Sequence, residues 1–287
     1  MKHPVYISID FEDFSYDLKR SLGLKASIRE DALWKSYEVI NNFCDKKLSS
    51  KKLTFFCTGV VARHAPDLIK TISNDGHEIG CHYNFHDLMY KQDLKTIEKN
   101  IIEGKDHIYN ACGEEAIGFR APVFSIPDSR IEIFDILSNY FKYDSSYVFK
   151  FDAKPHEGFE QKAPFNFCNM TEFPIIPKKY LGRFNIKSGG TFLRLFTKRV
   201  LKDVLKYNLE NNFVPLIYMH PYDYLSNGEF WVSLSDFFKT KSLSALSRYP
   251  RQVQWHYLNN RSVFKKLDYV LNEFEHQGPM RQLIEGK

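Results

Sequence analysis

The chain lacks the features that mark membrane-spanning and secreted proteins. Its 287 residues contain no apolar run that approaches about 18 residues, the length that a transmembrane helix needs. The first ten residues hold only a short apolar run and no small-residue cleavage site, so they predict a buried strand rather than a signal peptide. The five cysteines are an odd number with no C-x-x-C pair, which favours free thiols in a reducing compartment. We therefore expect a cytoplasmic protein.

A strong charge imbalance is also absent. The net charge of +5 is mild for this length, and no DNA or RNA recognition motif accompanies it, so nucleic-acid binding is not expected. Segment 178–206 is a local exception, since it holds nine Lys or Arg residues and a single acid, Asp203. Such a segment forms either a solvated helix face or a surface for a phosphate-bearing substrate or an anionic membrane. Membrane contact, if any, is expected to be peripheral and to involve this segment.

The chain shows no internal repeat, low-complexity tract or linker. Apolar runs of strand length alternate with helical patterns, which predicts an α/β fold with a parallel sheet or barrel. We expect a single domain over residues 1–287, with a C-terminal extension from about residue 222 packed on it. The expected strands are 5–9, 53–57, 78–81, 116–120, 171–174 and 214–219. The expected helices are 31–47, 65–74, 93–110, 127–141, 192–211 and 260–275, with a long loop over 151–167.

Two histidines, His82 and His86, directly follow the expected strand 78–81. At a spacing of four residues, two side chains lie about 5 to 6 Å apart on one face of a helical turn, so that both can bind one metal ion. The same spacing is common among histidines that bind nothing. It gains weight here because acidic residues, Arg120 and a further histidine, His220, lie at other expected strand ends.

Taken in order, these motifs resemble the polysaccharide deacetylase family, also called carbohydrate esterase family 4, which has the NodB-homology fold. The shared features are strand-end acids, H-x-x-x-H after a G-H-E-I-G strand, R-A-P, a Y-D-S-S turn and a strand-end histidine. The likeness is closest to a branch found among bacterial exopolysaccharide and O-antigen genes, and it spans nearly the whole chain. The stretches that resemble this branch are Ser8–Asp13, Gly118–Ile126, Gly189–Arg194, Tyr218–Pro221 and Trp255–Ser262.

The resemblance implies a distorted (β/α) barrel with one divalent metal ion, usually Zn2+, held by an aspartate and two histidines. His82 and His86 would be two of the ligands. The third is Asp13, with Glu12 as its substitute, because the family places two adjacent aspartates where this chain has Asp10-Phe11-Glu12-Asp13. If the strand continues, Asp10 and Glu12 share a face, whereas a turn after Phe11 would bring Asp13 inward.

The resemblance also implies the roles of the remaining residues. One carboxylate takes a proton from the attacking water, an arginine holds that carboxylate ionised, and a histidine protonates the leaving amine. A second aspartate orients this histidine, and a backbone N–H stabilises the oxyanion. In this order the implied residues are Asp10, Arg120, His220, Asp144 and either Val123 or Phe124.

These features predict a metal-dependent hydrolase that removes an N-acetyl or N-formyl group from an amino sugar in surface-polysaccharide biosynthesis. The substrate is expected to be nucleotide-linked or lipid-linked. One alternative is a hydrolase of another linear or cyclic amide, as in allantoinase-like relatives. Another alternative is a non-catalytic carbohydrate-binding protein on the same fold.

Overall fold

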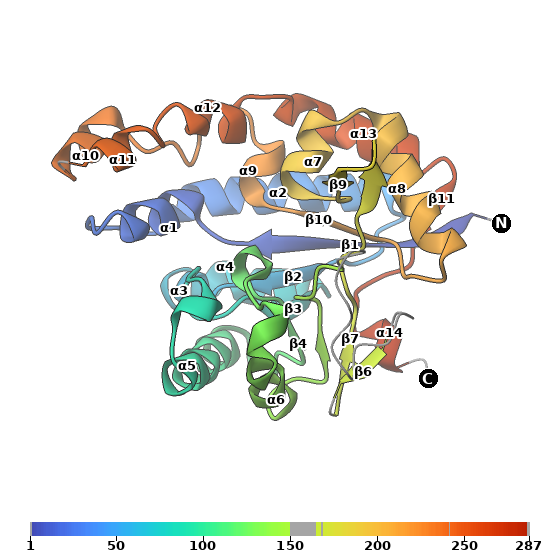
Figure 1. Cartoon of the computed structure of the whole chain (residues 1–287), viewed down its shortest axis with the longest axis horizontal. Coiled ribbons are helices and arrows are strands. Elements are labelled where there is room, and N and C mark those ends of the chain that lie inside the picture. Colours follow the sequence, from blue (N-terminus) through green and yellow to red (C-terminus); the bar gives the residue numbers. More distant parts are fainter. Residues whose placement is uncertain (1, 150–164, 168, 241, 286–287) are drawn as a thin grey trace.

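The computed structural model of the protein describes residues 2–149, 165–167, 169–240 and 242–285. Its centre is a curved sheet with helices packed around it (Figure 1). In spatial order the strands are β10 (Leu216–Met219), β1 (His3–Phe11), β2 (Thr54–Cys57), β3 (Glu78–Cys81), β4 (Gly118–Phe119), β5 (Tyr143–Asp144), β7 (Met170–Glu172) and β6 (Phe165–Phe167). A further strand, β11 (Phe274–His276), pairs with the start of β1.

The sheet is parallel at every one of these pairings except β6 with β7. Among the described strands β10 and β6 do not pair with each other, so the sheet is an open half-barrel. The predicted distorted (β/α) barrel is confirmed in this form. A separate hairpin consists of β8 (Lys178–Tyr180) and β9 (Phe184–Ile186).

In Figure 1, α3 to α6 lie beside or below β2 to β4, and α7, α8 and α13 lie above β1. The helices are α1 (Phe14–Ser21), α2 (Glu30–Lys47), α3 (Gly59–His64), α4 (Pro66–Asn74), α5 (Leu94–Cys112), α6 (Glu132–Ser138), α7 (Gly190–Leu195), α8 (Lys198–Glu210), α9 (Pro221–Tyr224), α10 (Leu234–Lys239), α11 (Leu243–Leu246), α12 (Arg251–His256), α13 (Val263–Val270) and α14 (Gln282–Glu285). Both chain ends lie on the right in this view, opposite to the direction in which β1 runs.

The central elements form where the sequence carries a strong apolar pattern. β2, β3 and β10 are buried at every position, and β1 is buried from Ile7 onward. Parallel strands that are covered on both faces have near-continuous apolar sequences. In α2 the buried Leu33, Tyr37, Ile40 and Cys44 recur at helical intervals and form one stripe.

Other expectations about the elements were wrong. The helix expected over 192–211 is two helices, because the chain is extended at Phe196 and the side chain of Thr197 caps α8 by accepting from the Val200 N–H. The helix expected over 260–275 ends at Val270 and is followed by β11. Of the loop expected over 151–167, residues 151–164 lie outside the described residues and 165–167 form β6.

The region after residue 222 contains more structure than expected. Helices α10 to α12 lie between residue 222 and the expected helix 260–275, where no element was expected, and β11 then returns to the sheet. In β11, Phe274 lies opposite His3 and His276 lies opposite Val5. The two ends of the chain therefore meet in the same sheet. The predicted C-terminal extension thus supplies a strand to that sheet.

The basic segment 178–206 forms the β8–β9 hairpin, α7 and α8. Several of its cations have acidic partners: Lys178 lies 2.8 Å from Asp203, and both Lys202 and Lys206 contact Glu273. Within the described part of the chain, no helix has both the length and the apolar character to cross a membrane. Peripheral contact with a membrane through this segment stays a prediction.

Candidate metal centre and catalytic pocket

Glu12, His82 and His86 bring their ligand atoms together at the carboxyl ends of β1 and β3. The Glu12 Oε2 atom lies 2.6 Å from His86 Nε2 and 3.6 Å from His82 Nε2. All three ligand atoms lie within 4.8 Å of one another. One carboxylate oxygen and two imidazole nitrogens are a common donor set for zinc.

Two of these ligand atoms have no partner outside the cluster. Glu12 Oε2 and His82 Nε2 are buried, and neither makes a hydrogen bond with a described residue beyond the cluster. Buried polar atoms without partners are costly and require an explanation. Burial raises the pKa of Glu12, yet His86 and His82 together lower it well below its usual range. The cluster therefore fits a divalent cation by geometry, by donor chemistry and by charge.

The two histidines are not on a helix, contrary to the expectation. They lie in the loop between β3 and α5, where Tyr83 has a φ of 68°. The Tyr83 carbonyl accepts from the Gly59 N–H at 2.8 Å, which fixes this turn against α3. The His82 Nδ1 atom lies 2.7 Å from the Arg120 carbonyl, so the ring donates there and directs Nε2 into the cluster.

The expectation that Asp13 is the carboxylate ligand does not fit this geometry. Asp13 is the N-cap of α1, and its carboxylate accepts from the backbone N–H groups of Ser15 and Tyr16 and from the Ser15 hydroxyl. It also accepts from the Arg29 N–H at 2.5 Å. Its lone pairs are thus occupied by the helix start and the loop that precedes α2. Glu12, the substitute, faces the histidines instead.

Asp10 and Arg120 form a buried ion pair beside the cluster. The Asp10 Oδ1 atom accepts from Arg120 Nη1 at 2.6 Å, and the arginine side chain has no exposed surface. Arg120 also donates to the Ser8 hydroxyl and to both oxygens of Ser145, while its guanidinium lies 4.2 Å from the Phe56 ring centroid. These contacts hold the guanidinium in one orientation, and the guanidinium in turn fixes the direction of the Asp10 carboxylate. The expected contact between these two residues is present.

His220 lies on the other side of Asp10, at the end of β10. Its Nε2 atom is 3.8 Å from Asp10 Oδ2, and its Nδ1 atom is 2.7 Å from Asp223 Oδ2. Asp223 in turn accepts from Arg194 Nε at 2.6 Å, and both of these side chains are buried. A buried chain thus runs from Arg194 through Asp223 to His220.

The electrostatics of this chain favour a protonated His220. Burial lowers the pKa of His220, but Asp223 and more distant carboxylates outweigh burial and raise it. Burial raises the pKa of Asp223, but His220 and Arg194 outweigh burial and lower it. The pair is therefore arranged as a carboxylate and an imidazolium.

The expected partner of His220, Asp144, has a different role. The Asp144 carboxylate accepts from the N–H and the hydroxyl of Ser146, and Asp144 lies opposite Glu172 in the pairing of β5 with β7. No contact between Asp144 and His220 occurs among the described hydrogen bonds and ion pairs. Asp223 takes the expected place. A signal was present, because Asp223 stands three residues after His220 and closes a capping box at the start of α9.

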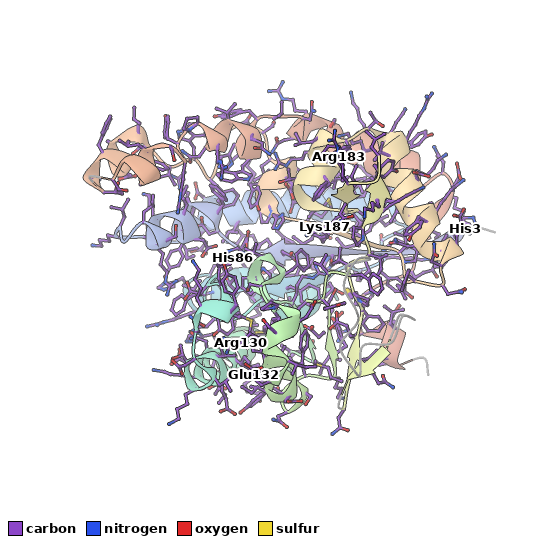
Figure 2. The ribbon with its side chains drawn as sticks, in the orientation of Figure 1. His3, His86, Arg130, Glu132, Arg183 and Lys187 are labelled. Carbon is purple, nitrogen blue, oxygen red and sulfur yellow. The ribbon has the colours of Figure 1, made fainter. Side chains whose placement is uncertain are left out.

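The pocket formed by these residues has a volume of about 210 Å³. The Tyr222 ring stacks on His220, with centroids 4.8 Å apart and planes inclined by 11°. Lys187 also lines the pocket and was given no role from the sequence. In Figure 2, His86 and Lys187 are both labelled in the middle of the molecule, on opposite sides of its vertical midline.

The backbone N–H groups of Val123 and Phe124, at the rim of the pocket, differ in whether they are already hydrogen-bonded. The Phe124 N–H donates to the Ala121 carbonyl at 3.0 Å and is therefore occupied. Val123 has a φ of 55°, and 62% of its surface is exposed at the pocket rim. Of the two expected oxyanion donors, Val123 is the one whose N–H has no hydrogen-bond partner among the described residues.

Comparison with known proteins gives two family matches. Residues 46–136 match the family model for polysaccharide deacetylase, and residues 148–285 match a domain of unknown function, DUF3473. The second region includes His220, Asp223 and Arg194, so the pocket combines residues from both matched regions with Asp10 and Glu12, which precede them.

Several solved structures align with this chain, and one of them has a TM-score above 0.5. A protein assigned as a polysaccharide deacetylase from Mycobacterium smegmatis has a TM-score of 0.58 at 16% identity, over 99% of this chain and 90% of that one. A family 4 carbohydrate esterase from Streptomyces lividans in complex with acetate has a TM-score of 0.46 at 12% identity, over 96% and 91%. A family 4 pseudoenzyme from Bacillus anthracis has a TM-score of 0.43 at 16% identity, over 96% and 67%.

Proposed function

We propose that this chain, whose residues 46–136 match the polysaccharide deacetylase family, is a metal-dependent hydrolase that removes an N-acetyl or N-formyl group from an amino sugar during surface-polysaccharide biosynthesis. One observation carries the proposal. Glu12 Oε2 and His82 Nε2 are buried without hydrogen-bond partners, next to His86 and the Asp10–Arg120 pair. This arrangement supports a cation beside a buried carboxylate that can act as a base.

The metal ion would be held by Glu12, His82 and His86. A divalent ion such as zinc supplies Lewis acidity there, polarising a carbonyl and lowering the pKa of water from about 16 to about 7. Glu12 is the main cause of the raised pKa of His86, whereas burial raises the pKa of the nearby Asp17 well above its usual range. The negative charge around the cluster favours a cation.

The protein's own side chains divide the proton transfers between them. Asp10 accepts a proton from the attacking water, and Arg120, which contacts Asp10 Oδ1 at 2.6 Å, holds the carboxylate in its orientation. His220 gives its Nε2 proton to the leaving nitrogen, and Asp223 keeps the imidazole charged. Asp10 and His220 lie 3.8 Å apart, so the acceptor and the donor act on the same reacting centre. The Val123 N–H would stabilise the oxyanion.

The proposal extends to the substrate and its location. A nucleotide-linked or lipid-linked amino sugar in the cytoplasm would suit a protein whose described cysteines, Cys44, Cys57, Cys81 and Cys112, are all free thiols. Cell fractionation with an antibody against the full chain tests this location. Recovery of the protein outside the cytoplasmic and inner-membrane fractions would contradict it.

The activity is tested by measuring release of acetate or formate from N-acyl sugars, before and after removal of metal with a chelator. We expect turnover to disappear on chelation, to return with added zinc, and to be lost in His82→Ala. His64→Ala is the matched control, because His64 is exposed on α3 outside the cluster. Full turnover after stringent metal removal would reject the mechanism.

A substrate panel separates the alternatives. Turnover of cyclic ureides, with no release of acetate or formate from sugars, would indicate a hydrolase of another amide. Sugar binding without any turnover in metal-loaded protein would indicate a carbohydrate-binding protein.

A further inference from the structure

Lys187 lies in the catalytic pocket and has no anionic partner there. It directly follows β9, and it lines the same cavity as Asp10, Glu12 and His220. Among the described residues its side chain has no hydrogen-bond or ion-pair partner. It contacts an aromatic ring instead, since the ammonium lies 4.9 Å from the Phe124 centroid.

Four other cations of the same basic segment do have acidic partners. Lys178 is paired with Asp203, Arg194 with Asp223, and Lys202 and Lys206 with Glu273. Lys187 is also largely removed from solvent, and this burial lowers the pKa of its ammonium. Removing a cation from water without a counter-ion costs free energy. A ligand that brings negative charge to Lys187 would therefore bind more tightly than a neutral one.

The backbone holds Lys187 firmly at this place. The next residue, Ser188, is buried and donates through its hydroxyl to the Leu216 carbonyl of β10. Gly189 packs directly on Tyr218 of β10, where an added Cβ would meet the backbone carbonyl at 2.3 Å. These contacts tie the end of β9 to the strand that carries His220, so Lys187 keeps its position relative to the reacting centre.

We propose that Lys187 is a specificity-determining residue that binds an anionic group, a phosphate or a carboxylate, carried by the amino sugar next to its N-acyl group. This inference rests on the proposed function, because it names the class of sugar that the same pocket accepts. The binding is a charge-assisted hydrogen bond from the ammonium to an anionic oxygen.

The outer part of the hairpin extends the positive charge away from the pocket. Arg183 stands in the turn of this hairpin, and its guanidinium lies 4.9 Å from the Phe184 ring centroid. Arg183 is exposed, and Figure 2 labels it farther from the centre of the molecule than Lys187.

The test compares binding of N-acetylglucosamine 1-phosphate with that of neutral N-acetylglucosamine by calorimetry, using the full-length protein with its metal content matched between variants. We expect Lys187→Met to weaken binding of the phosphate probe roughly 10- to 100-fold and to leave the neutral probe unchanged. Lys187→Arg should restore part of the loss. Lys179→Met is the control, since Lys179 is exposed on β8 of the same hairpin.

A second pair of probes distinguishes the source of the charge. Lys187-dependent binding of N-acetylglucosaminuronic acid but not of the 1-phosphate would assign a carboxylate, and the reverse would assign a phosphate. Equal effects of Lys187→Met on charged and neutral probes, or no effect on either, would overturn the inference. Because binding is read without turnover, a catalytically inactive protein that still shows Lys187-dependent binding would refute the proposed function and leave this inference standing.

Discussion

The carboxylate of Asp223 lies 2.7 Å from Nδ1 of His220, and it also accepts from the His220 backbone N–H at 2.9 Å. One carboxylate oxygen therefore fixes both the backbone and the ring of the histidine. With Nδ1 held in this way, only Nε2 is left to face Asp10 and the pocket. The general acid, His220, and the residue that orients it, Asp223, thus lie within four residues of sequence.

Replacing Asp223 should change the pH dependence of the reaction. His220 acts in its protonated form, and Asp223 raises its pKa, so the activity persists to higher pH. In Asp223→Asn this pKa falls, and we expect the alkaline limb of the pH–rate profile to move to lower pH, with kcat reduced by about 10- to 100-fold at neutral pH. The measurement is kcat against pH.

Asp144→Asn is the matched comparison for this experiment. Asp144 contacts Ser146 and not His220, so its replacement should leave the alkaline limb in place. A shift of that limb in Asp144→Asn but not in Asp223→Asn would contradict the assignment.

Substitutions of the adjacent acids Glu12 and Asp13 should have different effects, the first on metal binding and the second on stability. We expect Glu12→Gln to lose bound metal while keeping its fold, because Glu12 is directed at the two histidines. Asp13→Ala should instead keep the metal and lose about 1 to 2 kcal/mol of unfolding free energy, since it removes the cap of α1. Elemental analysis and urea unfolding give the two readouts, and metal loss in Asp13→Ala alone would reverse the assignment.

Arg120 should be needed for both stability and activity. Arg120→Met leaves the buried Asp10 carboxylate without its counter-ion, at a cost of about 3 to 5 kcal/mol of unfolding free energy. Adding Asp10→Asn removes the uncompensated charge, so the double variant should regain much of that stability while remaining inactive. Urea unfolding of the two variants checks this, and a double variant less stable than Arg120→Met would count against the pair.

Two glycines with similar backbone conformations should differ in their effect on activity. Gly190 has a φ of 52°, and an added Cβ would lie 3.2 Å from Cε1 of His220. Gly182 has a φ of 69° and open space around it. Both Gly→Ala variants should lose about 1 to 2 kcal/mol of stability from the left-handed backbone, but only Gly190→Ala should lower kcat. Equal activity in both variants would show that His220 tolerates the crowding.

The sequence was sufficient for the parts of the fold that carry strong apolar patterns. The buried strands β1, β2, β3 and β10 and the long helices α2 and α5 were expected close to their observed bounds. The short strand β11 was not, because three residues with only two buried positions give too little pattern to detect. The β8–β9 hairpin was obscured for a similar reason, since it is short and mostly exposed.

For the site, the residue types at strand ends predicted which side chains meet. The sequence did not show the local backbone geometry that brings them together. His82, His86, Asp10, Arg120 and His220 do meet in one place. The histidines meet through a turn at Tyr83 rather than through a helix, which spacing alone cannot distinguish.

Some site residues needed the structure before they could be assigned. Arg194 and Asp223 lie 29 residues apart in the sequence, and their buried pair with His220 depends on how α7 packs against α9. Asp13 could have been recognised as a helix cap, because aspartate is one of the residue types favoured at the N-cap.

The pairing of β11 with β1 has a consequence for how the protein is made. His3 is synthesised before its strand partner Phe274, which follows 271 positions later. The start of β1 cannot pair with β11 until the residues between them have been made, and contacts so distant in sequence form slowly. A chain truncated before β11 would therefore leave the start of β1, the strand that delivers Asp10, without this partner and prone to aggregation.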